Sequence, residues 1–173
     1  MARYISTQEL KLTIDEIVAP TSRLVVILPF EDVKSQKLFD KWILIPDPTI
    51  ELTLILSGPF DVLTTLTLDA VEAVHKLQSV RIIYHDGPLI SRILTDARSL
   101  LLPNGFSERS SDKAGVLSKI GIDNQNDLVK IESRSRLVYK KVAIFKKKFF
   151  GLQKTFEKSS VVENTLGFDI NPS

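Results

Sequence analysis

The side chains best suited to chemistry lie in one short stretch of the sequence, from His85 to Asn104. Its centre, "LISRILTDARSLLLPNG" (89–105), has the pattern of two short strands joined by a turn at 95–98, which predicts a β-hairpin. An arginine there can bind an anion through two parallel hydrogen bonds. The alternative for Arg92 is a rim arginine paired with a local acid. The candidate ligand-binding residues are Ser91, Arg92, Asp96, Arg98, Asn104 and His85, with Arg92 and Arg98 facing the anion.

Several other kinds of chemistry lack the residues that they need. The chain has no cysteine and only two histidines, His75 and His85, so a thiol nucleophile is excluded and a histidine metal site has little material. No phosphate-binding glycine loop, His-Glu-x-x-His or Gly-x-Ser-x-Gly motif is present. We therefore expect no metal and no cofactor. His75 is expected on an exposed helix face, and a structural role is the alternative for His85.

Length and composition suit one domain with a real core. The 173 residues are 43% hydrophobic, and no apolar run is long enough to cross a bilayer. The N-terminus has no signal-peptide pattern, so we expect a cytoplasmic protein. Ten Lys or Arg and three Asp or Glu lie between Asp127 and Lys158, which leaves a mildly acidic remainder beside a basic segment. This asymmetry is typical of a nucleic-acid or anionic-membrane contact, and a solvated helix face is the alternative.

The order of predicted elements indicates an α/β protein. Helices are expected at 6–18, where Ser6 and Glu9 form a capping-box pattern, and at 31–43 and 67–78. Buried strands are expected at 23–30, 51–57 and 80–85, followed by the hairpin and a strand at 114–122. Strands alternating with helices predict a mixed, largely parallel sheet of about six strands flanked by helices.

The C-terminal segment shows a different period. Between residues 126 and 158, apolar residues recur at steps of three and four, which predicts an amphipathic helix. Gly151 disfavours one continuous helix. The helix would pack on its own domain, form a dimer seam or lie on a membrane surface. For a nucleic-acid contact, the candidate residues are Lys140, Lys141, Lys146, Lys147, Lys148 and Lys154.

With this element order and the hairpin, the chain resembles the phospholipase D-like superfamily, in its form with one such domain per chain. In that family the hairpin carries a His-x-Lys pair, whose histidine attacks phosphorus. Laid on this chain, the nucleophile position falls on Ile90 and the lysine position on Arg92. An alkyl side chain cannot be a nucleophile, so the resemblance implies a hairpin without catalysis. Relatives with degenerate hairpins serve as effector-sensing domains of archaeal sugar-responsive transcription regulators.

We therefore predict a non-catalytic binding or regulatory domain for a partner protein or a small anionic ligand, and favour a homodimer. The alternatives are a nucleic-acid-binding protein that uses the basic segment, and a metal-independent phosphodiesterase or nuclease whose site is misaligned. The expected division is a phospholipase D-like domain over 1–122, a basic helix over 123–160 and a tail over 161–173.

Overall fold

The computed structural model describes residues 2–29, 43, 49–57, 79–107, 109–147 and 154–163. For 138, 139, 141–147 and 154–163, only the backbone is described. The predicted helices at 31–43 and 67–78 therefore lie outside the described residues, apart from Ile43. The described helices are α1 (Thr7–Val18) and α4 (Ile122–Ser133). The described strands are β1 (Arg3–Ile5), β2 (Arg23–Pro29), β3 (Glu51–Ser57), β4 (Val80–His85), β5 (Ser91–Leu94), β6 (Arg98–Leu102), β7 (Gly115–Lys119), β8 (Ser135–Lys147) and β9 (Lys154–Glu163).

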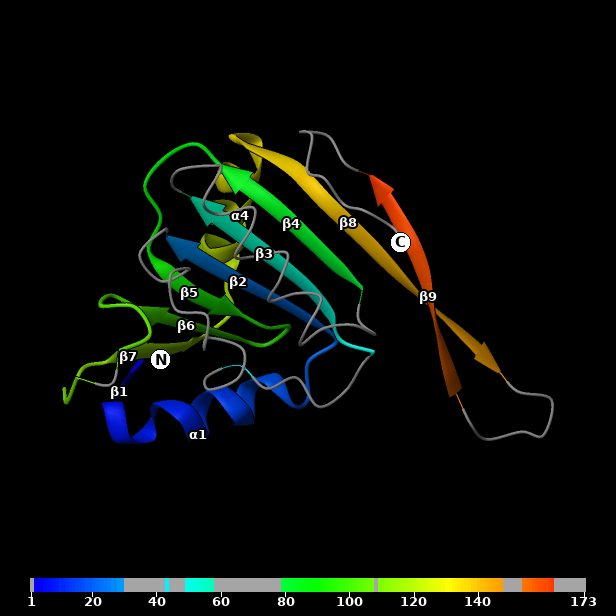
Figure 1. Ribbon diagram of the computed structural model, residues 1–173. Helices are drawn as coiled ribbons and strands as arrows, with labels where there is room; N and C mark the ends of the chain where they lie inside the picture. Colours follow the sequence, from blue (N-terminus) through cyan, green and yellow to red (C-terminus); the bar gives the residue numbers. More distant parts are fainter. Residues whose placement is uncertain are drawn as a thin grey trace.

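These strands form one mixed sheet in the order β1-β7-β6-β5-β2-β3-β4-β8-β9 (Figure 1). The pairs β2–β3 and β3–β4 are parallel, and the other six pairs among the described strands are antiparallel. The α/β class is confirmed, but a largely parallel sheet of about six strands is wrong. Among the strands described, parallel pairing is confined to the three central strands β2, β3 and β4. The hairpins on either side of them add antiparallel neighbours.

The first helix forms where its capping pattern predicts. The Ser6 hydroxyl accepts a hydrogen bond from the backbone N–H of Glu9 at 3.4 Å. The apolar stripe of α1 includes Leu10, Ile14 and Ile17, which are buried in the larger core cluster. This cluster occupies one face of the sheet and also contains the inward side chains of all three parallel strands, such as Leu54. The apolar stripe of α1 is therefore buried against the sheet, as an amphipathic surface helix requires.

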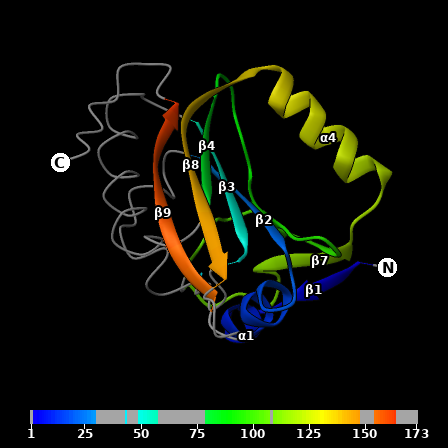
Figure 2. The same cartoon turned by 90° about the vertical axis from the view of Figure 1, so that its right-hand side faces the viewer.

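The opposite face of the sheet carries a smaller core beneath α4 (Figure 2). Ile27, Ile55 and Ile83 form a row across the three parallel strands, and Leu128 and Ile131 of α4 pack against it. No residue of α4 is fully buried. This helix therefore covers only part of the sheet face.

The C-terminal helix predicted over 123–160 is wrong beyond α4. Helix α4 ends at Ser133, and residues 135–147 and 154–163 form an antiparallel hairpin. The missing position of the apolar stripe, at Ser135, marks the change from helix to strand. Residues 137–145 are rich in β-branched and aromatic types, which favour a strand once the sheet offers an edge to pair with.

Candidate functional site

The side chain of Arg92 packs between the sheet and α4. Arg92 pairs in register with Ile27 of β2, and its side chain is only 20% exposed. A guanidinium nitrogen lies 3.8 Å from a carboxylate oxygen of Asp127 on α4. The alternative interpretation of Arg92, an arginine paired with a local acid, therefore describes its position. Ser91, the preceding residue, is buried.

Asp96 fixes the turn of the hairpin to the loop between α1 and β2. One of its carboxylate oxygens accepts hydrogen bonds from the Ser22 hydroxyl at 2.5 Å and from the Ser22 backbone N–H at 2.7 Å. The backbone N–H of Asp96 donates to the Thr21 hydroxyl at 3.0 Å. The two bonds from Ser22 are the main reason that the pKa of Asp96 lies below its ordinary value of 3.8.

His85 is a buried connector between β4 and the end of α4. Its Nδ1 lies 2.9 Å from the Ser135 hydroxyl and 3.2 Å from the carbonyl oxygen of Ile131. These contacts join β4, α4 and the start of β8. They favour the structural role that was the alternative for this histidine.

The six residues predicted to bind a ligand do not converge on one site. Asp96 and the exposed Arg98 lie at the turn end of the hairpin. Asn104 is exposed in the turn after β6, at the other end of the hairpin. There Gly105 takes a positive φ of 69°. Ile90, where the predicted resemblance to the phospholipase D-like superfamily puts the nucleophile, is 58% exposed.

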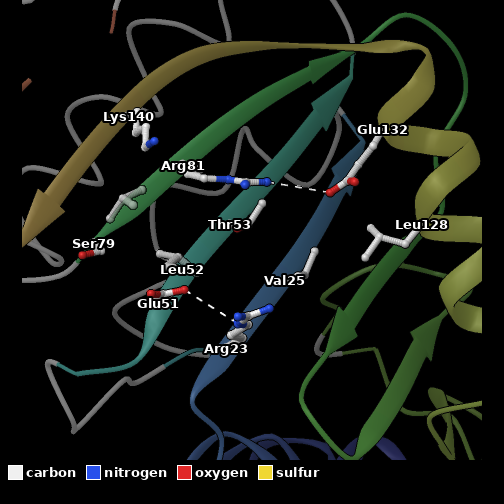
Figure 3. A pocket seen from close by; sticks show the side chains of 11 residues that line it. Arg23, Val25, Glu51, Leu52, Thr53, Ser79, Arg81, Leu128, Glu132 and Lys140 are labelled. Carbon is white, nitrogen blue, oxygen red and sulfur yellow. Dashed lines mark ion pairs between the residues drawn. The ribbon is translucent and has the colours of Figure 1, made fainter. Parts of the chain in front are cut away.

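A groove opens beside α4, over the first half of the parallel strands (Figure 3). Its volume is about 440 Å³. The row Val25, Thr53, Arg81 and Lys140 runs across β2, β3, β4 and β8 in direct register and forms its floor. Its remaining lining residues are Arg23, Glu51, Leu52, Ser79, Val80, Leu128 and Glu132.

Two ion pairs cross the groove, and both are visible in Figure 3. Arg81 on β4 lies 3.7 Å from Glu132 on α4, and Arg23 lies 3.8 Å from Glu51 on the neighbouring strand. Lys140 has no ion pair with a described side chain. Three cationic and two acidic side chains line the groove, so it carries one excess positive charge.

This groove was not predicted from the sequence. Thr53, Arg81 and Lys140 are far apart along the chain and meet only through strand register. One signal was present, because Arg81 interrupts the otherwise apolar start of a buried strand. Glu132 belonged to a segment expected to form a longer helix.

The basic segment forms an arm at the edge of the sheet. Strand β8 pairs with β4 only from Ser135 to Lys141, whereas residues 143–147 pair with β9 alone among the described strands. Figure 1 shows this part of the hairpin reaching past the body of the sheet. The register sets Lys147 opposite Lys154. Lys148 lies outside the described residues.

Other kinds of site find little support in the described residues. They contain no cluster of three or more His, Asp or Glu residues able to hold a metal ion. No helix among them has the length and apolar character required to span a membrane.

The comparisons with known proteins show a likeness of fold. No protein-family model and no curated protein matches the chain. A solved structure, "Structure of TrmBL2, an archaeal chromatin protein, shows a novel mode of DNA binding", matches with a TM-score of 0.52 and 12% sequence identity. The match covers 80% of this chain and 52% of the other, so this chain spans about half the length of that protein. At this identity, the chain shares a fold with an archaeal chromatin protein.

Proposed function

We propose that this chain is a non-catalytic binding domain that contacts nucleic-acid phosphates through its basic arm. The observation that carries the proposal is the arm itself, residues 143–147 of β8 and 154–158 of β9, which pair with each other beyond the part of β8 that pairs with β4. Four lysines and one glutamate lie in these ten residues. This concentration of charge on a two-stranded ribbon suits a polyanion better than a neutral partner.

The dimensions of the arm fit a duplex. Five residue pairs extend about 15 Å at the usual strand rise of about 3.4 Å per residue. The major groove of B-DNA, about 12 Å wide, admits a two-stranded ribbon of this kind. Lysines at its end would neutralise phosphates and release counterions, which favours binding without sequence preference.

Two further observations support the proposal. The position of the family nucleophile holds an alkyl side chain, Ile90, which favours binding over phosphodiester cleavage. The similar fold belongs to an archaeal chromatin protein whose structure shows a mode of DNA binding. The relationship to the phospholipase D-like superfamily stays a prediction, as do the homodimer, the cytoplasmic location and the division into 1–122, 123–160 and 161–173. The hairpin ligand site also stays a prediction, and its six residues do not converge on one place in the structure.

The direct test is binding of a fluorescently labelled, mixed-sequence 20-base-pair duplex, measured by anisotropy. We expect saturable binding at low salt by the full chain. The triple variant Lys146→Gln, Lys147→Gln, Lys154→Gln should bind at least about thirtyfold more weakly, since each phosphate contact raises the binding constant by close to tenfold at low salt.

A matched control separates the effect of the arm on duplex binding from the effect of net charge. The variant Lys113→Gln, Lys119→Gln, Lys130→Gln removes three lysines from the body of the domain and should bind within about threefold of the parent chain. Equal losses in the two triple variants would refute a specific role for the arm. Binding to anionic vesicles but not to the duplex would instead identify a membrane contact and overturn the proposal.

A further inference from the structure

We infer that the groove beside α4 is a second binding site, for a small organic monocarboxylate with an apolar body. The site is separate from the distal arm and does not depend on the proposed nucleic-acid contact. Its volume of about 440 Å³ lies within the range of small-molecule sites, about 300 to 1,000 Å³. Seven of its eleven described lining residues are polar or charged, which suits a charged ligand, and Val25, Leu52, Val80 and Leu128 supply the apolar part of the lining.

Two cations on neighbouring strands favour the binding of an anion in the groove. Arg81 and Lys140 are direct cross-strand partners, and both line the groove. Like charges in that position repel, which destabilises the pair unless an anion lies between them. Glu132 meets Arg81 at 3.7 Å, but Lys140 has no ion pair with a described side chain. One carboxylate between the two cations would neutralise the excess charge of the groove.

Thr53 adds a hydroxyl to the same position. It precedes Arg81 in the cross-strand row and lies between the two ion pairs of the groove (Figure 3). Within the described part of the chain, its hydroxyl has no hydrogen-bond partner, although it is half-buried. It can therefore donate to a carboxylate held by Arg81 and Lys140.

The apolar body of the ligand is inferred from the end of the groove away from Lys140. Val25 and Leu128 line the groove and are half-buried, and neither carries a polar group. A hydrocarbon or aromatic group that lay between them would remove apolar surface from water. The excess of one positive charge favours a monoanion over a dianion such as phosphate.

The test uses the full chain, labelled with ¹⁵N, and benzoate as the probe, with its neutral isostere benzamide as the comparison. Benzoate should shift the backbone amide signals of Thr53, Arg81 and Lys140 with saturation, and benzamide should bind at least about tenfold more weakly. The variant Arg81→Gln should weaken benzoate binding about tenfold, as expected for one charge-assisted hydrogen bond. Glu132→Gln should strengthen it about two- to fivefold, because it removes the carboxylate that competes for Arg81.

Two control variants match the charge changes of Arg81→Gln and Glu132→Gln but lie away from the groove. Arg109→Gln and Asp112→Asn, both exposed in the loop before β7, should leave the benzoate affinity unchanged. The inference is overturned if benzamide binds as tightly as benzoate, if the shifted signals lie outside the groove, or if Arg81→Gln and Arg109→Gln have equal effects. It is also overturned if benzoate produces no saturable shift. Each of these results leaves the duplex assay of the arm variants unaffected.

Discussion

The ion pair between Arg92 and Asp127 should stabilise the protein measurably, because one partner is largely buried. The charged groups are 3.8 Å apart, and their side chains are 20% and 54% exposed. Two unit charges at this distance attract by about 1 kcal/mol in water and about 4 kcal/mol at an effective dielectric constant of 20. Since the carboxylate is half in solvent, we expect a coupling energy of about 1 to 2 kcal/mol.

A double-mutant cycle with Arg92→Gln and Asp127→Asn measures this energy by urea unfolding. The pair Arg23 and Glu51 is a matched control, because its charges are also 3.8 Å apart but its side chains are 79% and 65% exposed. Its coupling should be below about 0.5 kcal/mol. Equal couplings in the two cycles would refute the argument that burial makes Arg92 part of the packing of α4.

Three further predictions concern the scaffold. Asp96→Ala should lower the free energy of unfolding by about 1 to 2 kcal/mol at neutral pH, through loss of two hydrogen bonds from Ser22. Because folding lowers the pKa of Asp96, its contribution is complete above the ordinary value of 3.8 and declines as the pH falls through the lower, folded value. The difference from the parent chain in urea unfolding should therefore shrink in acid, and a constant difference would contradict this cause. His85→Ala should cost about 1 to 3 kcal/mol by breaking the contact with Ser135 and should increase amide exchange in α4, whereas unchanged exchange would refute its connecting role. Leu54→Ala, at a fully buried core position, should cost about 2 to 5 kcal/mol in thermal or urea unfolding, and a loss below about 1 kcal/mol would contradict its place in the core.

The sequence predicted best those elements whose pattern is local. The Ser6 cap, the apolar runs of β3 and β4 and the β5–β6 hairpin are determined by nearby residues, and the structure has each of them where expected. The C-terminal helix was wrong because the helical spacing of apolar residues was given more weight than the β-branched and aromatic residues of 137–145, which favour a strand. Tertiary pairing with β4 decides between the two structures.

The groove required information that no local pattern carries. Arg81 and Lys140 become neighbours only because β8 returns antiparallel to β4, and Glu132 approaches Arg81 only because α4 crosses the sheet face. Arg92 and His85 were predicted to bind a ligand. Their contacts with α4 and the start of β8 show that packing explains both positions.

The most direct test of the proposed function is the salt dependence of duplex binding by the parent chain and by the arm variant lacking Lys146, Lys147 and Lys154. Each phosphate contact contributes about −0.9 to the slope of log K against log salt concentration. If the arm binds phosphates, the three substitutions should make the slope less negative by about 2 to 3. An identical slope in the two proteins, or binding that is insensitive to salt, would contradict nucleic-acid binding through the arm.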